Sequence, residues 1–145
     1  MKLALSQVAK AVSNGAKLVA GGKQLDREGF FMQAALLTGV TKDNPIFYEE
    51  IFGPAAIVYP VADDDAAIAL ANDSPYGLGG SIHTSNVERG RKLAERIETG
   101  MVFINEPTGT APELPFGGVK NSGYGRELSS NGIEEFVNHK LIRSA

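Results

Sequence analysis

The stretch that decides the fold reads AAIVYPVADDDAAIALAN at residues 55–72. It begins with an apolar, strand-like run over 55–61 and continues as a helix-like run over 64–72. Asp63, Asp64 and Asp65 stand where that helix begins, and carboxylates stabilise a first helical turn because its N–H groups are unpaired. The acidic run is therefore interpreted as a helix start, and it requires no metal ion.

The same alternation continues downstream, with a strand pattern at 79–83, a helix at 86–98 and a strand at 101–104. The second helix opens with Ser85-Asn86-Val87-Glu88, which has the spacing of a capping box. Strands that alternate with helices indicate a parallel sheet with right-handed crossovers. We therefore predict an α/β fold with an open parallel βαβαβ sheet, whose ligands bind beyond the carboxyl ends of the strands. Asn105 lies at such an end.

The residues before this alternation predict one helix and one strand pair. Gly15 is expected to end the helix as its carboxyl cap. Runs at Lys17–Ala20 and Phe30–Val40 are bracketed by turn residues and are expected to pair as strands. The apolar helix positions follow the i, i+3, i+4, i+7 spacing of one buried face, at Leu5, Val8, Ala9 and Val12.

Composition excludes several classes of protein. The chain has 145 residues, a formal net charge of −3 and no cysteine, which suits one domain or part of one in the cytoplasm. Its basic residues are scattered, so we expect no nucleic-acid surface, and no apolar run predicts a membrane span or secretory peptide. His83 and His139 lack neighbours at ligand spacing, so no metal site is expected.

A glycine-rich segment, LPFGGVKNSGYGRE, occupies residues 114–127. Its glycines, at 117, 118, 123 and 125, let the backbone turn sharply and approach a ligand or another chain. Phe116 would form a fixed wall beside them. The alternative is a plain surface loop that joins a strand to a helix.

Two further motifs accompany this segment: EEIFGP at 49–54 and ANDSPYGL at 71–78. Taken in this order, the three motifs resemble the NAD(P)-dependent aldehyde dehydrogenases, and the resemblance covers essentially the whole chain. It implies a cysteine nucleophile, a general-base glutamate and a dinucleotide-binding unit that all lie more than fifty residues upstream of the EEIFGP motif, whereas only 49 residues of this chain precede Glu50. The resemblance therefore makes this chain a carboxyl-terminal portion, with no catalytic residue of its own and no expected activity in isolation.

The resemblance also divides the chain into two parts. Residues 1–136 would complete a catalytic domain, and 137–145 would form an oligomerisation strand that pairs with another subunit. Val137 to Arg143 has the mixed apolar and basic composition of such a strand. The alternative is a short, non-catalytic assembly or binding module that keeps the site motifs as relics.

The resemblance assigns the nicotinamide cofactor to Glu50 and Phe52. The Glu50 carboxylate would accept hydrogen bonds from both hydroxyls of the nicotinamide ribose, a geometry that its two oxygens allow. Glu49 is the less favoured partner, and a solvated turn is the alternative for both glutamates. Phe52 would pack near the nicotinamide, or else belong to the core. The choice between NAD and NADP is left open.

The resemblance assigns the small aldehyde substrate to Phe116, as a pocket wall, and to the loop 105–113, which selects substrates. This loop looks most like the bacterial succinate-semialdehyde dehydrogenase branch of the family. Thr110 would donate its hydroxyl to the distal carboxylate of that substrate.

Overall fold

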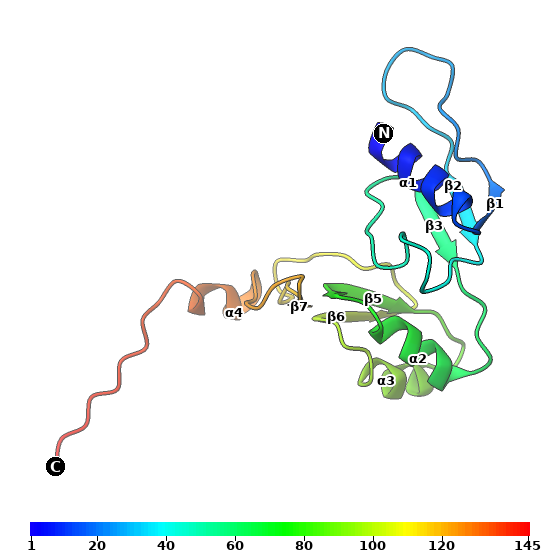
Figure 1. The fold of residues 1–145 in the computed structure, drawn as a ribbon. Coiled ribbons are helices and arrows are strands. Elements are labelled where there is room, and N and C mark those ends of the chain that lie inside the picture. Colours follow the sequence, from blue (N-terminus) through cyan, green and yellow to red (C-terminus); the bar gives the residue numbers. More distant parts are fainter. The chain divides into compact units, whose positions relative to one another are not determined.

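The computed structural model describes residues 1–145, which form two compact units, Met1–Val61 and Ala62–Ala145 (Figure 1). The first unit contains α1 (Lys2–Ser13), β1 (Lys17–Ala20), β2 (Ala35–Thr38) and β3 (Ala55–Val58). Its three strands form one sheet in the order β1-β2-β3, antiparallel between β1 and β2 and parallel between β2 and β3. The predicted strand pair is confirmed.

The core of the first unit lies between α1 and this sheet. Leu37 and Ile46 are completely buried there, together with Val8 and Ala11 of the helix. The predicted helix face is wrong by a small rotation, because Ala9 and Val12 are exposed and the buried positions are Ala4, Gln7, Val8 and Ala11. Ala4 and Ala11 are small enough to let the helix approach the sheet closely. The spacing of apolar residues alone could not predict that the polar Gln7 is buried on the same face.

The second predicted strand is shorter than expected. It was expected over Phe30–Val40, but β2 begins at Ala35 and the preceding residues form a loop closed by a bridge between Gln24 and Met32. Phe30 lies in that loop and is 85% exposed. The apolar residues before Ala35 have no neighbouring strand to pair with, so their β propensity does not extend the ladder.

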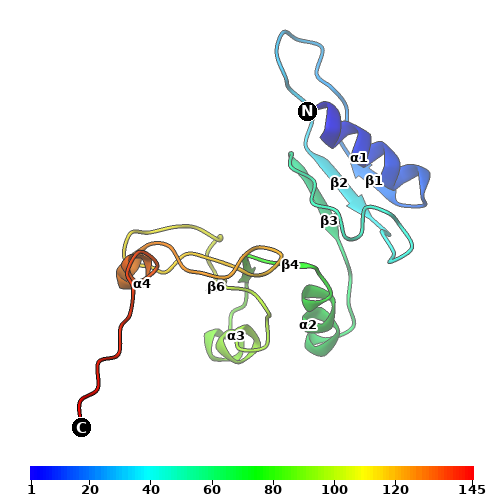
Figure 2. The same ribbon diagram turned by 60° about the vertical axis from the view of Figure 1, so that its left-hand side comes forward.

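The second unit contains three short helices and four short strands (Figures 1 and 2). Strands β5 (Gly79–Ile82) and β6 (Met101–Ile104) are parallel, and the chain crosses between them through α3 (Val87–Ala94). Both views show α2 (Asp64–Asn72) and α3 on the same face of this pair. The remaining elements are β4 (Tyr76–Gly77), its antiparallel partner β7 (Val119–Lys120), and α4 (Ser129–Glu134).

The predicted continuous parallel sheet is therefore wrong in its extent. The β5-α3-β6 unit is parallel as predicted, but β3 belongs to the sheet with β1 and β2. Between α2 and β5 the chain first forms β4, which pairs with β7 more than forty residues later in sequence. A two-residue strand is too short to show an alternating apolar and polar pattern, so the sequence could not predict the pairing of β4 with β7.

Both helix starts in this unit carry side-chain caps. Asp63 Oδ1 accepts a hydrogen bond from Ala66 N at 2.8 Å, as the acidic run predicts. In α3 the cap is Asn86, whose Oδ1 accepts from Arg89 N at 2.9 Å, and not Ser85 as the capping-box spacing suggested. The helix ends at Ala94, short of the predicted boundary. An ion pair from Asp64 to Arg89 joins the two helices.

The strand predicted over 137–143 is not formed, and residues 138–145 have neither helix nor strand. Both views show this tail extended beyond α4. Leu141 and Ile142 within it are 90% and 84% exposed. A strand needs a partner for its N–H and C=O groups, and this chain offers the tail none. None of the helices has the length and apolar character required to cross a membrane.

Candidate functional site

The turn at Glu49 and Glu50 places the two carboxylates in different environments. Glu49 Oε1 accepts from Lys10 Nζ at 2.6 Å, and its Oε2 accepts from Gln7 Nε2 at 3.2 Å. The hydrogen bond from Lys10, supported by that from Gln7, lowers the pKa of the Glu49 carboxyl below its ordinary value. Glu49 is thus engaged in holding α1 against the turn.

The Glu50 carboxylate, in contrast, is exposed and makes no hydrogen bond or ion pair within the chain. Its backbone is fixed, because Gln7 Nε2 also donates to the Glu50 carbonyl oxygen at 3.1 Å. The result is a positioned backbone that carries a carboxylate with both oxygens free to accept hydrogen bonds.

Phe52 follows two residues later and is 82% exposed, so the alternative that it belongs to the core of this chain is wrong. The structure explains why glycine is found at the neighbouring position 53, since a Cβ there would lie 2.7 Å from the Ala4 Cβ. A side chain at this position would push α1 away from the turn. Glu50 and Phe52 are therefore presented together on a turn that the first unit holds in place.

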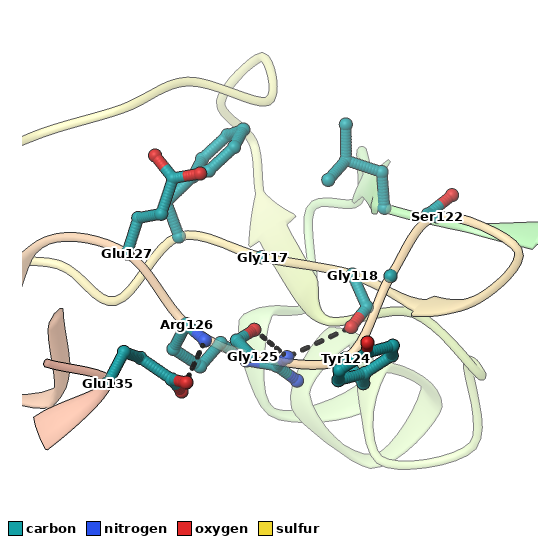
Figure 3. A pocket seen from close by; sticks show the side chains of 11 residues that line it. Gly117, Gly118, Ser122, Tyr124, Gly125, Arg126, Glu127 and Glu135 are labelled. Carbon is teal, nitrogen blue, oxygen red and sulfur yellow. Dashed lines mark hydrogen bonds between the residues drawn. The ribbon is translucent and has the colours of Figure 1, made fainter.

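In the second unit, the glycine-rich segment folds back on itself around a hollow of about 290 Å³ (Figure 3). A Cβ on Gly117 would lie 2.4 Å from the Gly125 carbonyl oxygen, and one on Gly118 would lie 2.6 Å from the Ser122 Cβ. The sequence predicts a close approach to a ligand or another chain, whereas the close approach in the structure is to other residues of the same segment. The segment is more than a plain connection, because β7 and a backbone bridge are built into it.

Arg126 holds this turn from within. Its Nη1 donates to the Gly118 carbonyl at 2.9 Å and to the Gly125 carbonyl at 2.7 Å, as Figure 3 shows. The next residue, Glu127, exchanges two backbone hydrogen bonds with Phe116, at 2.8 and 2.6 Å. Phe116 is therefore held by an isolated backbone bridge to the far end of the glycine-rich segment.

A second hollow, of about 240 Å³, brings Phe116 and Thr110 together. It lies alongside β6 and the loop that follows it, and its lining contains no charged side chain. Its other lining residues are Gly100, Met101, Val102, Phe103, Gly109, Leu114 and Pro115. The sequence did not single out the β6 residues or Leu114 and Pro115, although the apolar run at 101–104 and the motif's first two residues mark them.

The loop 105–113 is anchored where it leaves β6. Asn105 has a φ of 59°, and its side chain makes two hydrogen bonds to the backbone of Thr84, with Nδ2 donating to the Thr84 carbonyl at 2.9 Å and Oδ1 accepting from its N–H at 2.8 Å. Further along, the hydroxyls of Thr108 and Ser81 lie 3.4 Å apart. The loop therefore starts at the carboxyl ends of β5 and β6, where ligands of parallel sheets are expected.

Metal-binding groups are not gathered anywhere in the chain, since no three His, Cys, Asp or Glu side chains are placed to hold an ion. His139 Nε2 lies 2.9 Å from Glu134 Oε2 at the surface. His83 borders a separate cleft between α2, β5 and α3.

The aldehyde dehydrogenase family model matches residues 1–142. The chain belongs to the aldehyde dehydrogenase family. It is 54% identical over 139 residues to a succinate-semialdehyde dehydrogenase [NADP(+)] of Deinococcus radiodurans. This match covers 96% of the present chain and 29% of that protein. A succinate-semialdehyde dehydrogenase [NADP(+)] of Mycobacterium leprae is 47% identical over 136 residues, or 94% of this chain and 30% of that protein.

Solved structures of aldehyde dehydrogenases share the fold. The succinic semialdehyde dehydrogenase of Streptococcus pyogenes, in complex with NADP+, matches with a TM-score of 0.95 and 51% identity over 99% of this chain and 31% of that one. An aldehyde dehydrogenase of Mycobacterium tuberculosis, complexed with NAD+, matches with a TM-score of 0.86 and 42% sequence identity. The match covers 92% of this chain and 28% of that one. The chain thus spans about 30% of the length of these family members.

Proposed function

We propose that this chain is the carboxyl-terminal portion of a cytoplasmic, NAD(P)-dependent aldehyde dehydrogenase that oxidises succinate semialdehyde to the acid. One observation carries the proposal: in a member of this family, Phe116 and Thr110 line the same apolar hollow beside β6. An aldehyde needs an apolar wall and few, directional polar groups. The relatives that share about half of this sequence are succinate-semialdehyde dehydrogenases.

On the cofactor side, we propose Glu50 as the acceptor for the ribose hydroxyls of the nicotinamide cofactor, which would accept the hydride when bound. The residues fit this role, because the Glu50 carboxylate has no partner in the chain whereas Glu49 is paired with Lys10. Phe52 supports the assignment, since an aromatic ring that is 82% exposed gains from being covered by another ring.

On the substrate side, Phe116 would be the wall and Thr110 a hydroxyl donor to the distal carboxylate of succinate semialdehyde. The lining of the hollow has no cationic side chain, so the counter-charge for that carboxylate would come from residues outside this chain. The covalent step would likewise depend on a cysteine elsewhere, because the chain has none. Assembly into a homo-oligomer through residues 137–145 completes the proposal.

A chimaeric enzyme tests the cofactor assignment. Residues 1–142 would replace the matching segment of the Deinococcus radiodurans enzyme, and Glu50→Gln would be compared with Glu49→Gln. We expect Glu50→Gln to raise the KM for NADP+ or slow hydride transfer by about tenfold, because it loses a charge-assisted hydrogen bond. The Glu49→Gln variant should change these constants little. Equal effects of the two variants would contradict the assignment.

A second candidate function is a non-catalytic assembly module, which the exposed apolar tail favours. Phe136, Leu141 and Ile142 are each more than four-fifths exposed. Sedimentation of the purified chain, with and without residues 137–145, separates the two functions. A defined oligomer that depends on the tail, together with an inactive chimaera, would favour the module, and NADPH formation by the chimaera would favour the enzyme.

A further inference from the structure

The amino end of α4 is attached to the substrate-side loop. The Ser129 N–H donates to the Pro112 carbonyl oxygen at 2.9 Å. Pro112 lies at the end of the loop 105–113, two residues before Leu114, which lines the hollow with Phe116. This hydrogen bond therefore fixes the chain just before the predicted aldehyde wall.

The carboxyl end of α4 is attached to the glycine-rich segment. Glu135 follows the helix as its cap residue, and its Oε1 accepts from the Arg126 N–H at 3.2 Å (Figure 3). Arg126 directly precedes Glu127, the residue whose backbone exchanges two hydrogen bonds with Phe116. The second attachment therefore fixes the residues that form the backbone bridge to Phe116.

The backbone between these attachments is held in an unusual conformation. Leu128 and Ser129 have φ angles of 62° and 49°, which residues other than glycine seldom adopt. Such a conformation persists where surrounding contacts determine it. Here it turns the chain from the Glu127 bridge into α4, so that the helix reaches both Pro112 and Arg126.

We infer that α4 is a positioning element for the aldehyde hollow, and that Glu135 and the Ser129 amide are its two points of attachment. The inference rests on the proposed function, and it deepens that function by adding residues that touch neither substrate nor cofactor. The chain passes from α4 into the tail at 137–145. Docking of the tail on another subunit would therefore influence the position of Phe116 through these two hydrogen bonds. Glu135 acts through Arg126 and is a positioning residue.

Amide hydrogen exchange on the purified chain tests the positioning itself, with no need for activity. We expect Glu135→Ala to speed exchange at the Phe116 and Glu127 amides by about two- to tenfold, the range for loss of one exposed hydrogen bond. Glu135→Gln keeps an acceptor oxygen and should restore slow exchange. Glu134→Ala, at the neighbouring position, should leave both amides unchanged. Unchanged exchange in Glu135→Ala overturns the inference.

The Ser129 attachment is tested through its backbone angle. Glycine tolerates positive φ and keeps the N–H donor, whereas a β-branched valine is strained there. Ser129→Gly should therefore preserve slow exchange at Phe116, and Ser129→Val should lose it. Fast exchange in both variants, or in neither, contradicts the role of this amide.

The chimaeric enzyme then shows whether the positioning matters to the substrate. In the chimaera, Glu135→Ala should raise the KM for succinate semialdehyde about two- to tenfold, with the KM for NADP+ unchanged and rescue by Glu135→Gln. A faster exchange with no change in the aldehyde KM would overturn the link to the substrate. A chimaera without any activity would instead contradict the proposed function, while the exchange result would still decide the positioning.

Discussion

The two units differ in how they are stabilised. Every buried apolar side chain except Ile68 lies in residues 1–61, where Leu37 and Ile46 are completely shielded from solvent. In residues 62–145 the apolar strand β6 is only half-buried along its whole length. The first unit closes a core of its own, whereas the second keeps much of its apolar surface accessible.

The second unit compensates with close backbone contacts at its glycines. Gly100 and Gly118 each lie against neighbouring backbone with no space for a side chain, and Arg126 ties two carbonyls together. Such contacts define a shape but remove little apolar area from water, which is the main source of stability. The proposed substrate groups, Phe116 and Thr110, thus lie in the unit that buries less apolar surface, where local opening is expected to cost less free energy.

The largest expected effect comes from the core of the first unit. Leu37→Ala should destabilise that unit by about 2–5 kcal/mol, because it leaves a cavity in a fully buried position. Leu3→Ala, at a position that is 68% exposed, is the matched control and should change stability by less than about 0.5 kcal/mol. Denaturant titration followed by hydrogen exchange measures both. If amides in 62–145 lose protection equally, the two units unfold together and the contrast between them fails.

A smaller effect is expected from a glycine of the second unit. A Cβ on Gly100 would lie 1.9 Å from the Gly117 carbonyl oxygen, so Gly100→Ala should cost about 1–3 kcal/mol through displaced backbone. Gly80→Ala is the control, since nothing lies within 4 Å of that Cβ. Thermal unfolding of the two variants should separate them clearly. Similar melting temperatures would show that close backbone packing does not stabilise this unit.

The smallest expected effect is a pH dependence confined to the first unit. The pKa of Glu49 is lowered in the folded chain from 4.5, so its ion pair with Lys10 contributes fully above that value and is lost as pH falls through the folded pKa. Stability measured from about pH 6 down to about pH 3 should therefore fall more steeply in the original chain than in Glu49→Gln. Glu28→Gln should follow the original chain. If stability falls with pH in the same way in all three proteins, Glu49 does not contribute to the loss of stability in acid.

Local signals in the sequence predicted much of the secondary structure. Asp63 marked the start of α2 correctly, and the β5-α3-β6 crossover followed from alternating periods. The cap of α1 is Asn14, one residue before the predicted Gly15, which follows it with a φ of 96°. The errors mainly concern partners: the tail at 137–143 forms no strand because it has none to pair with, and β3 pairs within the first unit. The buried face of α1 was misplaced because it includes Gln7, whose amide finds acceptors more than forty residues away at Glu49 and Glu50.

The candidate site residues were singled out by their motifs more than by their chemistry, and their roles stay predictions. The sequence singled out Phe116 and Thr110, and the structure places both on one hollow. The roles of Glu50 and Phe52 stay predictions, although the pairing of Glu49 with Lys10 distinguishes the two glutamates in a way that their order in the chain could not. The role inferred for Glu135 had no signal in the sequence.

The sequence by itself determined the types and order of most elements, the absence of cysteine, and the motifs that mark the family. These properties depend on short-range periodicity, capping and composition, which neighbouring residues specify. Tertiary structure alone decided which strands pair, which glutamate is free, and how the two ends of α4 are attached to Pro112 and Arg126. Those contacts join residues distant in sequence, and their energies depend on partners that only the folded chain brings within reach.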